Sequence, residues 1–233
     1  MSSDSEFGIQ YPFAEIPQKG EWIEVARGVF WLQMSLPMAL DHINLYVLED
    51  DAGWDLGGPT PVFELIAESI SPGKLCIIGC GRGYDAIMFA QKGFDVTAVD
   101  FAPSAIQAVQ TLANEADVPV NTVETDIFSL TTDSTNTFEY IIEQTCFCAI
   151  NPNRRKDYEQ LVRQILKPGG KLIGLWFPLD KLVTDDGPPW GTTIDEVKSI
   201  FKLGWKIELE EFPELSIGPR KGREKLIIFR KQL

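Results

Sequence analysis

Metal-binding side chains are scarce in this chain. It has one histidine, His42, and four cysteines among 233 residues. Each cysteine lies in or beside a segment that predicts a buried strand, where reduced cysteine behaves as a small hydrophobic residue; they are Cys76, Cys80, Cys146 and Cys148. Cys146 and Cys148 would face the same side of a strand, but a zinc shell needs further ligands with regular spacing, and the sequence offers none. We therefore expect structural cysteines, no disulfide framework and no metal site.

Basic charge and long apolar segments are lacking as well. Lys and Arg total 21 against 34 Asp and Glu, which gives a formal net charge of −13. Nucleic acids and anionic membranes attract basic surfaces, so we expect neither as a partner and favour a small-molecule acceptor. No apolar run approaches the ~20 residues of a membrane span, and the polar, acidic start MSSDSEFG has no leader-peptide pattern. These features predict a cytoplasmic protein, which we expect to be a monomer or a dimer.

The clearest local pattern is a strand, a glycine turn, a helix and a second strand. The apolar residues 75–78 are typical of a buried parallel strand. Gly79, Gly81 and Gly83 follow at alternate positions, and a turn without Cβ atoms lets the backbone approach a ligand. Asp100 ends the second strand, about 20 residues past the glycines, where a carboxylate can accept hydrogen bonds from both ribose hydroxyls. This unit predicts a nucleoside ligand.

The glycine turn differs from a dinucleotide fingerprint at one position. That fingerprint reads G-x-G-x-x-G, and its last glycine lets helix and strand close around a pyrophosphate. Position 84 is tyrosine, so the pattern here is G-x-G-x-G. S-adenosylmethionine has no phosphate to place at a helix N-terminus, so the pattern favours this cofactor over a nicotinamide dinucleotide. A nicotinamide-dependent enzyme and a plain tight turn are the alternatives.

Strands and helices alternate along most of the chain after residue 53. The apolar periodicity predicts helices at 62–69, 85–92, 103–116, 154–166 and 194–201, and strands at 75–78, 94–99, 120–124, 138–142, 172–177, 205–211 and 225–230. The last two strands are expected to form a terminal hairpin. This is the plan of an α/β, Rossmann-like class I methyltransferase with a seven-stranded, mostly parallel sheet.

Candidate ligand contacts lie where strands end, because open α/β sheets bind ligands at the carboxyl ends of their strands. After the third strand, Asp126 can accept the adenine amino group while Ile127 contacts the ring. Glu143 follows the fourth strand and Asp180 the fifth, and either carboxylate or a water could take the proton of a thiol acceptor. Aromatic residues of the same segments are expected to line the acceptor site, namely Phe147, Phe177 and Trp190.

Residues 1–53 do not follow the alternating pattern. Strands are expected at 21–27, 29–34 and 44–48, which makes a short antiparallel arm. The run from Gly20 to Trp54 resembles the opening strands of a metallo-β-lactamase-type hydrolase, whose zinc site needs an H-x-H-x-D-H cluster. Only His42 is present, so the resemblance implies no hydrolase activity. We expect two parts, with residues 1–53 as the arm and residues 54–233 as a methyltransferase domain.

Several motifs after residue 53 together resemble the thiopurine S-methyltransferase family, and most of all its thiol and halide methyltransferase branch. They are WDLGGPTP at 54–61, IIGCGRGYD at 77–85, VTAVDFAPSAI at 96–106, ETDIF, EQTCFCAI, LKPGGKL, DGPPW and RKGREKL. The resemblance implies S-adenosylmethionine as cofactor and a small soft nucleophile as acceptor: a thiol, hydrosulfide, a halide or a thiopurine-like compound. The implied cofactor contacts are Trp54 on the methionine or adenosine part, Gly79, Gly81 and Gly83 at the turn, Asp100 at the ribose with Phe101 beside it, Asp126 and Ile127 at the adenine, and Glu143 at the cleft.

The arm replaces a helical segment with further tryptophans that the family normally has before the position of Trp54. Its apolar residues must pack somewhere; they include Trp22, Val25, Val29, Trp31, Leu45 and Val47. We expect the arm to close over the carboxyl edge of the sheet as a substitute lid, and the alternative is packing on a distant face or a second subunit. The alternative function is a non-catalytic protein that binds S-adenosylmethionine and has lost its acceptor site.

Overall fold

The computed structural model describes residues 22–26, 29–35, 42–48, 55–130, 134–182 and 187–232. The chain divides into two compact units, Met1–Gly53 and Trp54–Leu233. In the first unit, three strands form an antiparallel sheet in the order β1-β2-β3; they are β1 (Trp22–Ala26), β2 (Val29–Ser35) and β3 (His42–Leu48). The three strands expected near the N-terminus are therefore present, and His42 begins the third.

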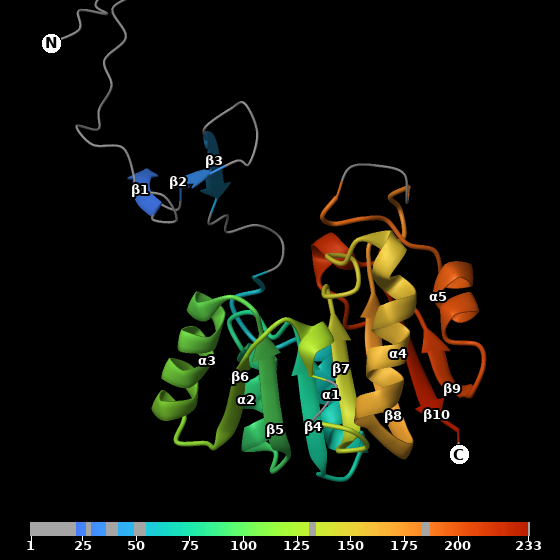
Figure 1. Cartoon of the computed structure of the whole chain (residues 1–233). Coiled ribbons are helices and arrows are strands. Elements are labelled where there is room, and N and C mark those ends of the chain that lie inside the picture. Colours follow the sequence, from blue (N-terminus) through green and yellow to red (C-terminus); the bar gives the residue numbers. More distant parts are fainter. Residues whose placement is uncertain are drawn as a thin grey trace, which may run out of the picture. The chain divides into compact units, whose positions relative to one another are not determined.

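The second unit is built on a seven-stranded sheet in the order β6-β5-β4-β7-β8-β10-β9 (Figure 1). Its strands are β4 (Lys74–Ile78), β5 (Asp95–Asp100), β6 (Val120–Glu124), β7 (Phe138–Gln144), β8 (Leu166–Trp176), β9 (Trp205–Glu211) and β10 (Lys225–Lys231). Neighbouring strands run parallel from β6 through β5, β4 and β7 to β8. Strand β10 is antiparallel to both of its neighbours, β8 and β9. The predicted mostly parallel sheet with a terminal hairpin is confirmed.

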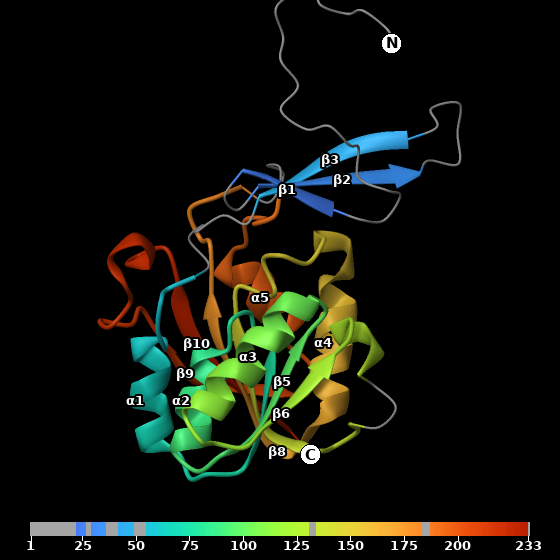
Figure 2. The same cartoon turned by 90° about the vertical axis from the view of Figure 1, so that its left-hand side faces the viewer.

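Helices cover both faces of this sheet (Figures 1 and 2). One face packs against α1 (Pro61–Ser69), α2 (Tyr84–Gln91) and α3 (Pro103–Glu115), and the other against α4 (Arg155–Ile165) and α5 (Ile194–Ile200). Alternate residues of a strand point to opposite faces, so Leu75 and Ile77 join the first core whereas Cys76 and Ile78 join the second. None of the helices in the described part of the chain is both long and apolar enough to cross a membrane.

Aromatic rings fill the core between the sheet and the layer of α4 and α5. The ring centroid of Trp176 lies 5.0 Å from that of Phe147 and 6.1 Å from that of Phe229, both edge to face. Phe201 stacks on Phe229 with centroids 5.0 Å apart. Such pairs add about 0.5–1.5 kcal/mol each beyond the area that they bury. The core therefore fixes the segment that leaves β7, because Phe147 belongs to that segment.

Two strand boundaries of this sheet differ from the prediction by two residues or more. β7 continues to Gln144, so Glu143 belongs to the strand and does not follow it. β8 begins at Leu166, in residues that were expected to end a helix and form a turn. Phe138 pairs with Leu166 but Tyr140 pairs with Lys171, so the additional residues of β8 form a bulge that lets the strand start early.

Candidate active site

The sheet changes its direction of connection between β4 and β7. From β4 the chain continues through α2 to β5, whereas β7 leads through α4 to β8 on the other side. Ligands of open α/β sheets bind at such a point, outside the carboxyl ends of the strands. The two segments that leave these strands touch, because a Cβ added at Gly79 would lie 3.1 Å from both Cβ and Sγ of Cys146. The candidate site is therefore built on the turn after β4 and the segment after β7.

The three glycines of the turn after β4 have different surroundings. Gly79, Gly81 and Gly83 all have positive φ angles, of 66°, 51° and 86°. A Cβ at Gly81 would meet no atom within 4 Å, so the backbone there is open to a ligand. A Cβ at Gly83 would lie 2.5 Å from Cγ2 of Val109, so this buried glycine allows α2 and α3 to pack closely. The expected role of Gly83 was to line the ligand, whereas the structure gives it a packing role.

Asp100, at the end of β5, faces the glycine turn. Its Oδ2 accepts a hydrogen bond from the Gly81 N–H at 3.0 Å, and its Oδ1 accepts one from the Ala102 N–H at 3.0 Å. Each carboxylate oxygen keeps a further lone pair, so the group can hold the turn and accept ribose hydroxyls at the same time. The adjacent Phe101 is 77% exposed, which leaves its ring accessible to a planar ligand.

The predicted adenine contacts lie directly after β6. Asp126 is exposed, and its Oδ1 accepts a hydrogen bond from the Phe128 N–H at 3.0 Å at the start of the short 3-10 helix η1 (Ile127–Ser129). Ile127 is 8% exposed and belongs to the core on the α4 side of the sheet. The structure therefore leaves the Asp126 carboxylate accessible but turns most of the Ile127 side chain away from solvent.

A polar cluster that the sequence did not predict connects three segments at the same edge. Asp85 on α2 accepts hydrogen bonds from the Thr60 N–H at 2.7 Å and from Thr60 Oγ1 at 2.9 Å. Thr60 Oγ1 also lies 3.0 Å from Oε1 of Gln144 at the end of β7. Burial raises the pKa of Asp85 to about 6, although the hydrogen bonds from Thr60 favour its charged form. Thr60 lies in the motif WDLGGPTP and Asp85 in the motif IIGCGRGYD. The occurrence of both motifs in one chain is the sequence feature from which a contact between the two residues could have been predicted.

Glu143 is 1% exposed, and its carboxylate points into the core. One oxygen accepts a hydrogen bond from the Phe147 N–H at 2.9 Å, and the other accepts one from the hydroxyl of Tyr158 on α4. Burial raises the pKa of Glu143 to about 7. Glu143 is thus an internal anchor for the segment after β7, which corrects its expected place at the cleft as a cofactor contact or proton acceptor.

The three aromatic residues expected at the acceptor site are not equivalent. Phe147 is 2% exposed within the aromatic core, so its expected place on the acceptor site is corrected to a core position. Phe177 and Trp190 are half-buried. The guanidinium carbons of Arg220 and Arg223 lie 5.3 and 5.2 Å from the centroid of the Phe177 ring. Two cationic groups therefore accompany Phe177, and the sequence pattern did not indicate them.

Asp180, the other predicted proton acceptor, forms an exposed ion pair with Arg223, with Oδ2 2.6 Å from Nε. The hydrogen bond from Arg223 lowers the pKa of the Asp180 carboxyl, which makes it a weaker base. Trp54, predicted to contact the cofactor, lies outside the described residues.

The four cysteines are free thiols. Burial raises the pKa of Cys80 and of Cys148 to about 12, and it raises the pKa of Cys76 and of Cys146 as well. These thiols stay protonated near neutral pH, so they are poor nucleophiles and poor metal ligands. Within the described ranges, no group of three or more His, Cys, Asp or Glu side chains is placed to hold a metal ion.

Comparison with known sequences connects these features to one family. The family model described as "Thiopurine S-methyltransferase (TPMT)" matches residues 47–230. "Probable thiol methyltransferase 2" of Arabidopsis thaliana is 36% identical over 180 residues, which cover 74% of this chain and 77% of that protein. "Thiocyanate methyltransferase 1" of Brassica oleracea is 34% identical over 179 residues, again 74% of this chain and 77% of that protein. None of these matches supports the resemblance of residues 1–53 to a metallo-β-lactamase-type hydrolase.

Two solved structures that share the fold at low sequence identity are methyltransferases. A S-adenosylmethionine-dependent methyltransferase from Methanosarcina mazei superposes with a TM-score of 0.63 at 19% identity and covers 72% of this chain and 97% of its own. The 1,6-didemethyltoxoflavin-N1-methyltransferase of Burkholderia thailandensis was solved with bound 1,6-didemethyltoxoflavin and S-adenosylhomocysteine. It superposes with a TM-score of 0.62 at 18% identity, and the match covers 91% of this chain and 100% of that chain. At such identities the likeness shows the fold alone.

Proposed function

Because the chain belongs to the thiopurine S-methyltransferase family, we propose that it transfers a methyl group from S-adenosylmethionine to a small soft nucleophile. That it is a S-adenosylmethionine-dependent methyltransferase follows from its family and relatives. The proposed acceptors are thiols, hydrosulfide, halides and thiopurine-like compounds, and the names of the thiol and thiocyanate methyltransferases among its relatives support this class. The structural observation that carries the proposal is the open backbone at Gly81 beside the Asp100 carboxylate, where the sheet changes direction.

The described residues fit the cofactor. We assign the ribose to Asp100, whose remaining lone pairs can accept both hydroxyls, and the amino-acid part to the open backbone at Gly79 and Gly81. The exposed ring of Phe101 offers an apolar face to the adenine, and the exposed Asp126 carboxylate can accept its amino group. Trp54 keeps its proposed cofactor contact from the family resemblance.

When bound, S-adenosylmethionine supplies an electrophilic methyl group on a sulfonium sulfur. In-line transfer needs no covalent enzyme intermediate, so the residues of this chain act mainly by holding the acceptor in line and by excluding water. Phe177 and Trp190 can provide apolar walls on the acceptor side. Arg220 is 2% exposed and lies near Phe177, but it pairs with the equally buried Glu224, Nη1 to Oε2 at 3.9 Å, which offsets its charge toward an acceptor.

Neither Glu143 nor Asp180, the two carboxylates predicted to accept the proton of a thiol acceptor, is suited to that role. Glu143 is buried and hydrogen-bonded on both oxygens, and Asp180 is held ionised by Arg223. We propose that a thiol binds as the thiolate, with its proton released to water. The rate with a thiol should then rise with pH according to the acceptor's own pKa, about 8.5 for an ordinary thiol, whereas a halide should show no such rise.

The test combines cofactor binding with a panel of acceptors. Titration calorimetry with S-adenosylmethionine, S-adenosylhomocysteine and NADH would establish the cofactor, and mass spectrometry of methylated products would rank thiols, hydrosulfide, thiocyanate, halides and a thiopurine. We expect binding of the two adenosyl compounds alone and transfer to at least one soft nucleophile. Binding without transfer to any member of the panel would favour the non-catalytic alternative, and binding of NADH instead would refute the cofactor.

A further inference from the structure

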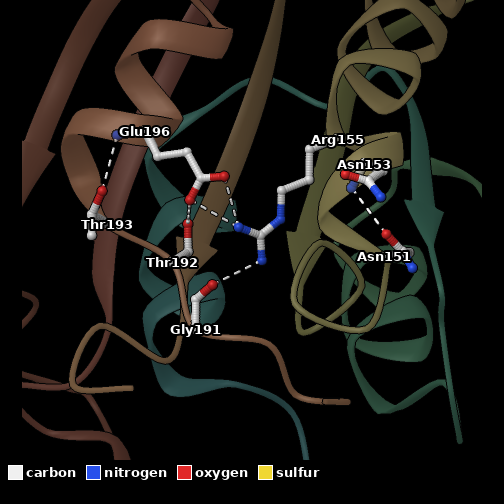
Figure 3. Close-up of polar contacts among 7 residues, drawn as sticks. All are labelled: Asn151, Asn153, Arg155, Gly191, Thr192, Thr193 and Glu196. Carbon is white, nitrogen blue, oxygen red and sulfur yellow. Dashed lines mark hydrogen bonds and ion pairs between the residues drawn. The ribbon is translucent and has the colours of Figure 1, made fainter. Parts of the chain in front are cut away.

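Arg155, the first residue of α4, has a fully buried guanidinium group with close polar partners. The residue is 1% exposed. Its Nη1 donates hydrogen bonds to both carboxylate oxygens of Glu196, at 2.9 and 2.8 Å, and its Nη2 donates one to the carbonyl of Gly191 at 2.9 Å (Figure 3). A buried charge is tolerated only with good partners, and charge-assisted bonds of this kind are the strongest that a side chain makes. Arg155 therefore holds α4, α5 and the segment before α5 in one arrangement.

The Glu196 side of this contact organises the segment 187–193. Oγ1 of Thr192 donates a hydrogen bond to Glu196 Oε2 at 3.2 Å, and the N–H of Glu196 donates one to Oγ1 of Thr193 at 3.1 Å, which caps α5 (Figure 3). One carboxylate thus accepts from both the guanidinium and a residue of the segment. If the guanidinium is lost, the Glu196 carboxylate keeps only the bond from Thr192, and the Gly191 carbonyl loses the bond from Arg155.

The same segment contains Trp190, which we place on the acceptor side. The Trp190 N–H donates to the Cys148 carbonyl at 2.8 Å, so the segment lies against the chain that leaves β7. The guanidinium of Arg155 lies 4.6 Å from the centroid of the Phe147 ring, in that same stretch. Arg155 consequently contacts both parts of the chain that meet at Trp190.

We propose that Arg155, acting through Glu196 and Gly191, is a positioning residue that sets the place of Trp190 and thereby the fit of the acceptor. This inference rests on the proposed function, because it assigns Trp190 to the acceptor side. Arg155 acts on the acceptor without touching it or the cofactor, since it is buried and both of its terminal nitrogens donate to protein oxygens. Its loss should change acceptor affinity and leave cofactor binding intact, because the glycine turn and Asp100 belong to other segments.

The adjacent Arg154 provides a matched control. It immediately precedes α4, and its guanidinium is about half exposed and pairs with Asp157 at 3.5 Å. The same group stacks on the ring of Phe128, 3.6 Å from its centroid, a contact that a lysine ammonium can also make. Exposed ion pairs of this kind contribute little to the stability of the fold. Arg155→Lys keeps the charge but loses the forked geometry, Glu196→Gln keeps the shape but loses the charge, and Arg154→Lys makes the same chemical change outside the buried contact.

The experiment measures the acceptor KM and kcat with the best acceptor from the panel, the Kd of S-adenosylhomocysteine by calorimetry, and hydrogen exchange of residues 187–193. For Arg155→Lys and Glu196→Gln we expect the acceptor KM to rise roughly tenfold, since small misplacements at a reacting centre are costly. The cofactor Kd should change less than about twofold, and exchange should accelerate in the segment; Arg154→Lys should match the parent protein in all three.

Three results would overturn the inference. Unchanged acceptor KM in both variants would show that the buried contact does not set the acceptor site. An equal loss of cofactor affinity would show a general structural role, or direct contact with the cofactor. Unchanged exchange in 187–193 would show that Arg155 does not hold the segment. Absence of transfer by the parent protein would instead refute the proposed function, which keeps the two failures distinguishable.

Discussion

Separate alanine substitutions at Gly81 and Gly83 should divide the glycine turn into a ligand-binding part and a packing part. At Gly83 the φ angle is 86°, and left-handed backbone costs an L-residue about 1–2 kcal/mol. The new Cβ would also lie 2.5 Å from Cγ2 of Val109, and such overpacking costs about 1–3 kcal/mol. We therefore expect Gly83→Ala to reduce the free energy of unfolding by about 2–5 kcal/mol.

At Gly81 the cost should appear in binding. Its φ angle of 51° imposes the same backbone penalty, about 1–2 kcal/mol, but no atom lies within 4 Å of an added Cβ. That open space is where we place the cofactor, so Gly81→Ala should weaken S-adenosylmethionine binding by roughly tenfold or more, about 1.4 kcal/mol at least. Gly83→Ala should bind the cofactor almost normally at a temperature where it remains folded.

Urea unfolding and titration calorimetry on both variants provide the assay. A double variant, Gly83→Ala with Val109→Ala, adds a control because it removes the methyl group that clashes; residues in contact typically couple by about 0.5–3 kcal/mol. The reasoning would be refuted if Gly83→Ala were no less stable than Gly81→Ala, or if the two substitutions weakened cofactor binding equally.

Three further predictions concern other parts of the chain. Asp100→Ala should weaken S-adenosylmethionine binding by about 1.5–3 kcal/mol, because it removes a charged acceptor of hydrogen bonds; an unchanged Kd in calorimetry would exclude the assigned role. Glu143 has a pKa raised to about 7 from 4.5, so the folded protein holds this proton more tightly, and the Glu143 contribution to stability should fall as pH rises through that interval. Urea unfolding should therefore show Glu143→Gln gaining stability relative to the parent between about pH 5 and about pH 8, and a difference independent of pH would contradict the burial argument. Deleting residues 1–50 should leave a folded protein by circular dichroism, because the unit Trp54–Leu233 has its own sheet and cores; if the arm is a lid, the truncated protein should bind the cofactor more weakly and lose transfer, and unchanged binding and activity would exclude the lid.

Local periodicity was sufficient for the sheet and for the ends of several strands. The apolar residues 75–78 and the carboxylate of Asp100 were placed correctly, because their positions follow from the two-residue period and from the glycine turn. Glu143 was misplaced because the strand was ended two residues early. With β7 continued to Gln144, Glu143 shares a face with Ile141, which points to the core of α4 and α5.

Other features depend on contacts between distant segments. Nothing near Gly83 indicates which of three glycines must accommodate a side chain of α3, and Val109 lies far along the sequence. Phe147 returns to the core through a turn in which Thr145 has a positive φ of 60°, an unusual conformation for a β-branched residue. The bond between Thr60 and Asp85 likewise requires that α1 and α2 be adjacent. Such contacts depend on which elements are neighbours in the folded protein, and this arrangement cannot be predicted from the local pattern of a single sequence.

The place of β10 in the sheet has a consequence for biosynthesis. This strand is made after β9 but lies between β8 and β9, and β9 pairs with β10 alone in the described sheet. Until residues 225–231 emerge from the ribosome, β9 has no partner and the outer side of β8 presents unpaired backbone groups. Such exposed edges are sites of aggregation in incomplete chains. The nascent protein should therefore complete its sheet only after these residues have been added.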